Sequence, residues 1–442
     1  MLTLSRLDAE IEAFMDWTAP TESEQLAREA VFDTTLGLIR DHLPNLSAAR
    51  MGSQVTGLAM PTSDADIRLY HPGRPYTTKL AKEVSSGMDI ICDVLKSHPA
   101  YTGTEILGGR FPLVDTMHTE TGISVQIVSP PSSKRSQNHI KQSCEDHPHL
   151  KALFTILKTA LDMRGLSSVY SGGLGSYTIF NMVLAALNLY RIEHPEPTEP
   201  ASPGTLLLYL FDFYGNRYNP YAFGIRASPF QLFRKRRKAT RAEQEEARTN
   251  MYLRLTLGIA KPVHLEHYML CLQDPVDAGN DLGRKSFAFK HVQSTMQYMA
   301  QKLRLMIDNQ AKVDCVLRGI VGRCDYHYDE RRTKLDLFGD GCEPNPKPLI
   351  EVGPKPARSH DDRDRLEQEE QEGDDEEEVD EELVLDEDPV EALMEKTEQR
   401  LREEQVREEQ IREEIKENQR EHEERDRKGG DDLKGEDSWG YM

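Results

Sequence analysis

Two closely spaced carboxylates follow a glycine-serine turn early in the chain, and together they could bind a metal ion beside a phosphate. The turn is Gly52-Ser53 and the carboxylates are Asp64 and Asp66. Successive strand side chains point to opposite sides, so the two aspartates share a face while Ala65 and its apolar neighbours face the core. Carboxylates beside backbone amides can hold Mg²⁺ against a nucleoside triphosphate. The spacing predicts a metal-dependent nucleotide site.

A later segment, Gly122–Val128, departs from this pattern. Its apolar residues Ile123, Val125 and Ile127 alternate with polar ones, so Gln126 is predicted to face the same site as the two aspartates. Two-metal sites keep their cations about 3.5–4 Å apart and depend on carboxylates to offset the repulsion. A neutral amide at this position predicts that the metal beside an attacking hydroxyl is poorly held. Nucleotide binding through the other metal, which accompanies the triphosphate, should be weakened less by this replacement.

From about Glu10 to about Leu305 the chain resembles the RNA-terminal nucleotidyltransferases of the polymerase-β superfamily, the branch with nuclear poly(A) polymerases and terminal uridylyltransferases. Besides the turn and the aspartates, the resemblance includes Arg110–Val114, after which that family carries a third catalytic aspartate. Counting along this segment places the third aspartate on Gln126. The resemblance implies that Asp64 and Asp66 hold Mg²⁺ or Mn²⁺ and that the Gly-Ser turn holds the terminal phosphates.

A second cluster, Ser171–Thr178, supports a nucleotide pocket independently of the aspartates. A glycine-rich entry to a helix offers free amides to an anion, and a nearby lysine can neutralise it. By resemblance, Lys158 contacts the triphosphate, Ser176 hydrogen-bonds to it, and Tyr177 stacks on the base. A solvated helix lysine is the alternative interpretation of Lys158. The 18-residue step from Lys158 to Ser176 matches the family and favours the nucleotide role.

The loop Leu272–Arg284 is the other specific match. In the family this loop reads the base edge, and uridylyl-adding members commonly carry His where this chain has Asn280. Asn280-Asp281 therefore suggests ATP rather than UTP, and the whole loop resembles the nuclear exosome-linked poly(A) polymerases. The alternative is a plain turn, for which Ala-Gly-Asn-Asp is well suited.

One dense basic patch follows the helices of the middle region: Arg234, Lys235, Arg236, Arg237 and Lys238. It could follow an RNA backbone, serve as a nuclear import signal, or lie in a solvated loop. The nucleus is the favoured location and the cytoplasm the alternative. Because the sequence shows no RNA-recognition module, a protein partner is expected to supply selectivity for the RNA.

Composition separates the body of the chain from its end. The net charge of −21 lies entirely in residues 355–442, and the preceding residues balance to zero, so an RNA partner for the body is not excluded. The six cysteines show no C-x-x-C pair, which predicts free thiols in a reducing compartment. No apolar run approaches the roughly 20 residues of a membrane span, and the first residues lack the features of a transit peptide. We expect no membrane partner and a soluble, intracellular protein.

Periodicity predicts an α+β fold in which a strand-rich palm is inserted into a helical domain, and the resemblance implies that this is a polymerase-β-like nucleotidyltransferase palm in a helical PAP-associated central domain. A helix opening at Thr21–Glu24 and running through Ile39, and a helix near 78–96 crossing a small sheet, are expected. The expected units are N-terminal helices packing on the central domain (1–46), the palm (47–147), the helical central domain (148–350), an acidic disordered linker (351–390), a charged single helix (391–428) and a disordered tail (429–442). The apolar spacing in the charged segment favours a solitary helix over a coiled coil.

These observations leave two main hypotheses for function. One is a template-independent RNA 3′-terminal adenylyltransferase that adds AMP from ATP, with Gln126 at the third aspartate's position. The other is an inactive nucleotide- or RNA-binding scaffold that keeps the pocket without the chemistry. A bridging protein acting through its acidic helical tail is a third, weaker hypothesis.

Overall fold

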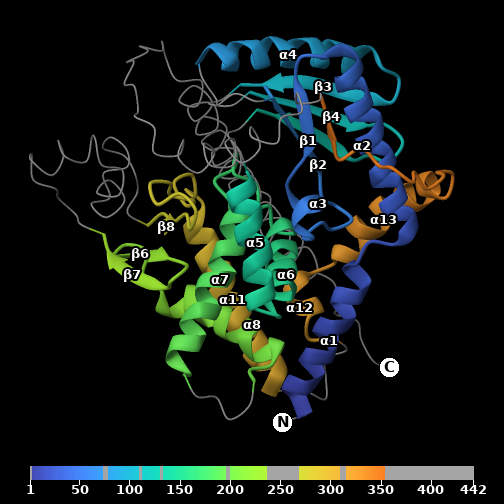
Figure 1. Cartoon of the computed structure of the whole chain (residues 1–442). Coiled ribbons are helices and arrows are strands. Elements are labelled where there is room, and N and C mark those ends of the chain that lie inside the picture. The colour runs from blue at the N-terminus through green and yellow to red at the C-terminus, as the bar shows by residue number, and fades with distance from the viewer. Residues whose placement is uncertain are drawn as a thin grey trace, which may run out of the picture. The chain divides into compact units, whose positions relative to one another are not determined.

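The computed structural model describes residues 2–72, 78–108, 112–129, 133–195, 200–235, 268–308 and 315–353. In these residues a sheet-based palm packs beside a helical lobe (Figure 1). This arrangement confirms the predicted α+β palm with a helical central domain. The acidic linker, the charged helix and the tail predicted beyond residue 353 lie outside the described residues.

The palm is a six-stranded mixed sheet in the order β3-β4-β5-β2-β1-β9. Only β2 and β5 run parallel; the other neighbours are antiparallel. The strands are β1 (Ser47–Arg50), β2 (Ala65–Tyr70), β3 (Tyr101–Leu107), β4 (Leu113–His118), β5 (Ser124–Val128) and β9 (Glu351–Val352). Helices α2 (Glu22–His42) and α4 (Thr78–Ser97) supply apolar side chains to its core, and the short α3 (Ser53–Thr56) follows β1. The expected crossing helix is confirmed in α4.

Helix α2 begins where the sequence predicts. The Thr21 hydroxyl accepts a hydrogen bond from the Glu24 amide at 3.1 Å, and the Glu24 carboxylate accepts one from the Thr21 amide at 2.9 Å. This capping box satisfies amides that have no partner inside a helix. Such reciprocal capping explains the sharp start of the helix.

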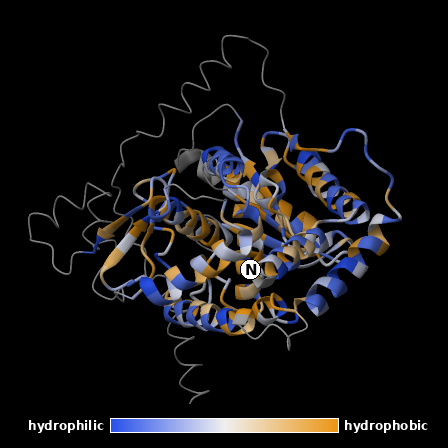
Figure 2. Ribbon diagram, turned by 90° about the horizontal axis from the view of Figure 1, so that it is seen from below, coloured by the Kyte–Doolittle hydropathy of each residue, from blue (hydrophilic) through white to orange (hydrophobic). Residues whose placement is uncertain are grey.

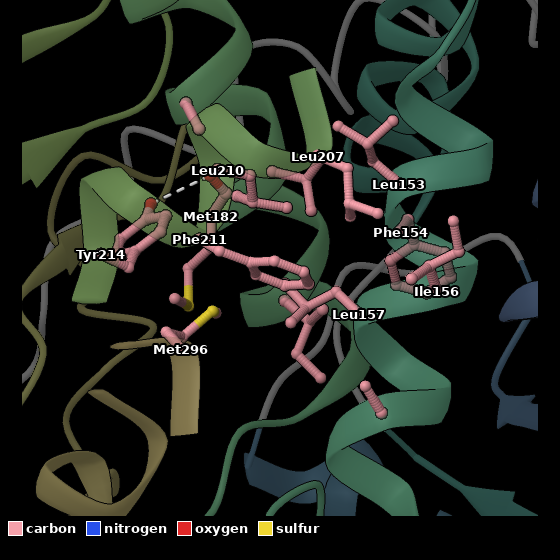
Figure 3. Close-up of a cluster of buried hydrophobic side chains, with 14 of the residues drawn as sticks. Leu153, Phe154, Ile156, Leu157, Met182, Leu207, Leu210, Phe211, Tyr214 and Met296 are labelled. Carbon is pink, nitrogen blue, oxygen red and sulfur yellow. Dashed lines mark hydrogen bonds between the residues drawn. The ribbon is translucent and has the colours of Figure 1, made fainter. Parts of the chain in front are cut away.

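The helical lobe comprises α1 (Leu2–Thr18), α5 (Lys134–Asp146), α6 (Leu150–Asp162), α7 (Ser176–Glu193), α8 (Pro203–Asp212), a π-turn η1 (Phe213–Arg217), α11 (Phe289–Asp308), α12 (Arg318–Val321) and α13 (Cys324–Gly339). A small sheet lies at its side, in the order β7 (Gln231–Arg234), β6 (Phe223–Arg226), β8 (Leu272–Gln273). Its core includes Phe211, Leu157 and Met296, and the buried Tyr214 hydroxyl donates to the Met182 carbonyl at 2.9 Å (Figure 3). Hydrophilic and hydrophobic stretches alternate along the helices in Figure 2, as expected for helices that are buried on one side.

The two N-terminal helices pack on different lobes, which corrects the expectation that both pack on the central domain. Helix α1 contributes Leu7 and Ile11 to the helical core, whereas α2 buries Phe32 and Leu36 in the core of the palm. The physical reason is that α2 leads directly into β1, and its apolar stripe covers the sheet. Two later segments also contact the palm: α13 packs on α2, and β9 pairs with β1.

All six cysteines are free thiols, as predicted. None of the helices in the described ranges is long and apolar enough to cross a membrane.

Candidate functional site

The two aspartates lie where the strand pattern predicts. Ala65, Ile67 and Leu69 of β2 are at most 1% exposed and face the core of the palm. Asp66 therefore points to the opposite face, and Asp64 immediately precedes the strand. Both carboxylates line a cavity of about 610 Å³.

Gly52 lets the turn after β1 approach the strand that carries Asp66. Its φ is +70°, a conformation that favours glycine. A Cβ atom built on Gly52 would lie 2.1 Å from Oδ2 of Asp66. The Met51 amide also donates to the Asp66 carbonyl at 2.9 Å. The turn and the carboxylate are thus in direct contact, with no room for a larger residue.

The charge of the two aspartates is not balanced by the groups around them. Burial and the neighbouring charge of Asp64 raise the pKa of Asp66 to about 7. Burial and the charge of Asp115 likewise raise the pKa of Asp64, and Lys158 opposes this only in part. Crowded carboxylates that resist ionisation are what a bound cation would relieve. These two oxygen donors fit the divalent cation that travels with a triphosphate.

The site has fewer carboxylates than two metal ions would need. Within the described ranges, no three His, Cys, Asp or Glu side chains come together as a metal site. Gln126 faces Asp66 across the parallel pairing of β5 with β2, and its Nε2 lies 3.5 Å from Oδ2 of Asp64. The side chain thus has the predicted orientation, and a neutral amide stands beside the two aspartates.

The cavity has two walls. Gly52, Ser53, Asp64 and Asp66 form what we call the palm wall. Lys158 of α6, together with Ser176 and Tyr177 at the start of α7, forms the helical wall, so residues more than 100 positions apart meet around one space. Free amides at the start of α7 and the Lys158 ammonium suit a polyanion. The volume is within the range of small-molecule sites.

Lys158 already has an anionic partner on the helical wall. Its Nζ lies 2.5 Å from Oδ1 of Asp162, one helical turn away. An incoming phosphate would therefore compete with a carboxylate for the ammonium group. The Lys158 side chain is largely covered, at 17% exposure, so it is not the solvated helix lysine of the alternative interpretation.

Asp274 links Tyr177, which is predicted to stack on the base, to Asn280, which is predicted to read it. The Tyr177 hydroxyl donates to Oδ1 of Asp274 at 3.1 Å, and Nδ2 of Asn280 donates to Oδ2 of Asp274 at 2.9 Å. Asp274 is 6% exposed, and burial together with its charge raises the pKa of Tyr177. One of the two N–H groups of the Asn280 amide is thereby engaged, and its second N–H and its carbonyl oxygen could each contact a ligand.

The neighbouring Asp281 has a structural task. Its Oδ1 accepts from the amides of Leu272 and Gly283, at 3.0 and 2.8 Å, and closes the loop. Burial raises its pKa. A direct contact with nucleotide stays a prediction for Asp281, as does base reading for Asn280.

Arg28 of α2 supports this site from behind the loop before Asp64, and sequence analysis did not find it. It is 3% exposed and donates to the carbonyls of Met60, Pro61 and Ser63, at 2.9, 2.6 and 2.8 Å. Burial lowers its pKa to about 10. Arg28 fixes the loop that leads into Asp64, and its charge favours ionisation of that carboxylate. A lone arginine in a helix carries no sequence signal for such a role.

Only the first two members of the predicted basic patch are described, and Arg236, Arg237 and Lys238 lie outside the described residues. Nζ of Lys235 donates to the carbonyls of Pro220 and Met269, both at 2.7 Å, and burial lowers its pKa. Lys235 thus holds two loops together and is not directed at a polyanion, which corrects the expectation for this residue. Arg234 is exposed at the end of β7, and its guanidinium lies 5.9 Å from the Phe223 ring.

The palm, the two aspartates and the two-walled cavity define a nucleotidyltransferase-like site. Residues 7–129 match the model of the central palm domain of mitochondrial-like poly(A) RNA polymerases. The chain is 26% identical over 285 residues to the poly(A) RNA polymerase cid14 of Schizosaccharomyces pombe, which covers 64% of this chain and 38% of that protein. Over these regions the chain is similar to the Cid1/Trf4-like poly(A) RNA polymerases.

Two solved structures share the fold. The polymerase core of TRAMP, an RNA surveillance complex, superposes with a TM-score of 0.57 at 21% identity, over 72% of this chain and 94% of that one. The Cid1 poly(U) polymerase bound to MgGTP superposes with a TM-score of 0.51 at 16% identity, over 71% of this chain and 98% of that one.

A Drosophila melanogaster relative, Trf4-2, carries the name of an inactive poly(A) RNA polymerase. It is 25% identical, and the alignment covers 72% of this chain and 74% of Trf4-2. The alignment with the S. pombe protein spans well under half of that protein.

Proposed function

We propose that this chain is a Mg²⁺-dependent RNA 3′-terminal adenylyltransferase that takes ATP as its substrate. The observation that carries the proposal is the cavity itself. One wall offers two aspartates and a glycine-serine turn, and the other offers a lysine, a helix start and a tyrosine. Asp64 and Asp66 would hold Mg²⁺, which when bound neutralises the triphosphate. Gly52, Ser53, Lys158 and Ser176 would hold the phosphates, and Tyr177 would stack on the base.

The choice of ATP rests on the loop that carries Asn280. The hydrogen bond from its Nδ2 to Asp274 supports a fixed orientation of the Asn280 amide, and its carbonyl oxygen would accept a hydrogen bond from the base. The exocyclic amino group of adenine is a donor, whereas the corresponding atom of uracil, O4, is an acceptor. The resemblance of the loop to adenylyl-adding relatives supports the same choice.

The relatives support an RNA substrate and a protein partner. The first solved relative is the polymerase core of an RNA surveillance complex. A partner that selects the RNA fits a chain whose described basic residue Lys235 is engaged within the fold. A nuclear location stays a prediction, because most of its basic signal lies outside the described residues.

An inactive nucleotide-binding scaffold is the second candidate, and Gln126 is the observation that favours it. The amide beside Asp64 and Asp66 leaves two carboxylates where the family carries three. The existence of a relative named as inactive is compatible with this candidate.

A single assay separates the two candidates. The full chain is incubated with a short labelled RNA, ATP and Mg²⁺ or Mn²⁺, with Asp64→Ala as the control. The proposal expects RNA ladders that depend on Asp64. Calorimetric binding of ATP and Mg²⁺ without any ladder, together with ladders from Gln126→Asp, would establish the scaffold instead. Absence of ATP binding would contradict both.

A further inference from the structure

The strand pairing places a second carboxylate beside Gln126. Asp115 of β4 is directly opposite Gln126 of β5, and Gln126 is directly opposite Asp66 of β2. Residues paired in this way project from the same face of a sheet. Asp66, Gln126 and Asp115 therefore form a row across three adjacent strands. The charge of Asp115 is felt at Asp64, where it contributes to the raised pKa.

Asp115 is too far from Asp66 to share its cation. Neighbouring strands lie about 4.8 Å apart, so two steps separate the backbones of Asp66 and Asp115 by roughly 10 Å. In keeping with this distance, the described residues contain no group of three metal-binding side chains. A role as a substitute metal ligand does not fit the geometry of the sheet.

The order of the strands puts Asp115 on the side from which an attacking group must come. The Gly52-Ser53 turn, which would hold the departing phosphates, follows β1 on one side of β2. Strands β5 and β4 lie on the other side of β2. In phosphoryl and nucleotidyl transfer, the attacking and leaving oxygens are in line on opposite sides of the phosphorus. We therefore expect the nucleophile to approach from the side of β5 and β4, beyond the residues that line the cavity, where Gln126 and Asp115 lie.

The Asp115 carboxylate is held in a fixed position. The hydroxyl of Ser124, which precedes Gln126 by two residues on the same face, donates to Oδ1 of Asp115 at 3.1 Å. This contact uses one of the two carboxylate oxygens. A positioned carboxylate next to a reacting hydroxyl can act as a general base.

We propose that Asp115 is the catalytic base, receiving the proton of the RNA 3′-hydroxyl in place of activation by a second metal ion. This inference rests on the proposed function. The 3′-oxygen gives its proton to Asp115 and forms a bond to the α-phosphorus of ATP. The bond between that phosphorus and the bridging oxygen breaks, and pyrophosphate leaves. Asp115 then releases the proton to solvent.

The test uses the full chain with labelled RNA, ATP and Mg²⁺ in single-turnover reactions. Asp115→Asn should slow AMP incorporation roughly 100-fold or more, as expected for loss of a general base, and leave ATP affinity within about twofold. The matched control is Glu105→Gln, because exposed Glu105 is paired with Asp115 on the outer strand β3. It should leave the rate within about threefold, as surface substitutions do. Formate should partly restore Asp115→Ala, which a structural role would not predict.

A second measurement separates a base from a metal ligand. Mn²⁺ bound per chain is counted by electron paramagnetic resonance with a non-hydrolysable ATP analogue. The wild type and Asp115→Asn should bind the same number. One ion fewer in the variant would make Asp115 a ligand and overturn the base role, and so would near-normal turnover of Asp115→Asn. A wild type that binds ATP yet incorporates no AMP would instead overturn the proposed function, and the base role with it.

Discussion

The palm wall and the helical wall of the cavity differ in how well their polar groups are satisfied. On the palm wall, Asp64 and Asp66 are crowded and both have raised pKa values. On the helical wall, Lys158 pairs with Asp162, and Tyr177 and Asn280 share Asp274. The difference teaches that a bound cation would stabilise the palm wall, whereas the polar groups of the helical wall already have partners within the fold. Substitutions on the two walls should therefore behave differently.

The sharpest test of this comparison is Asp66→Asn. The variant loses a donor to the cation, so affinity for ATP with Mg²⁺ should fall more than about 100-fold by calorimetry. It also removes a buried carboxylate that resists ionisation, so the ligand-free chain should become more stable in thermal unfolding at pH 8. Reduced stability of the ligand-free variant at pH 8 would argue against an unsatisfied palm wall.

Gly52→Ala should come next, with Gly57→Ala as its control. Both glycines have positive φ, at +70° and +75°, but only at Gly52 would a Cβ meet a neighbour, at 2.1 Å from Asp66. Backbone strain should cost both variants roughly 1 kcal/mol of unfolding free energy, and Gly52→Ala should lose more because its Cβ would clash with Asp66. Only Gly52→Ala should weaken ATP binding, by roughly 10- to 100-fold. Equal losses of affinity in both variants would show that the contact with Asp66 is unimportant.

Binding should also depend on pH through the palm wall. Because the pKa of Asp66 is raised to about 7, this group holds a proton in the folded chain that the unfolded chain releases near pH 4. Stability of the ligand-free chain should therefore fall as pH rises from about 4 to about 7. Cation binding needs the ionised carboxylate, so affinity for ATP with Mg²⁺ should weaken about tenfold per unit below pH 7. Calorimetry across this range, repeated on Asp66→Asn, measures the contribution; a flat wild-type profile would contradict it.

On the helical wall, Lys158→Met should weaken ATP binding roughly tenfold, through loss of one charge-assisted contact. Asp162→Asn is the informative partner, because it releases Lys158 from its 2.5 Å ion pair. Affinity in Asp162→Asn should be unchanged or higher. A fall in affinity would mean that Asp162 positions the lysine and does not compete for it.

The smallest expected effect is on base choice. Asn280→His should raise the use of UTP relative to ATP by about fivefold, because it removes an oriented carbonyl acceptor. RNA extension is measured with each nucleotide separately. A ratio unchanged from the wild type would remove the assignment of Asn280 to the base.

Sequence reasoning found local features well and long-range ones poorly. The start of α2 at Thr21 follows from neighbours in the chain and is confirmed, and Asp64 and Asp66 line one cavity, as strand alternation predicts. The packing of α2 on the palm was missed, because an apolar stripe shows that a helix is covered but not by which lobe. The task of Lys235 was missed as well, since its charge in the sequence says nothing of the carbonyls it meets in the fold.

The sequence by itself determined the glycine turn, the side to which the aspartates point and the orientation of Gln126, because each depends on only a few neighbouring residues. Only the tertiary structure decided what stands next to them. It brought Arg28 under the loop before Asp64, set Asp115 opposite Gln126, and joined Tyr177 to Asn280 through Asp274. These contacts depend on strand pairing and helix packing between distant segments, and local periodicity does not indicate which distant segments meet.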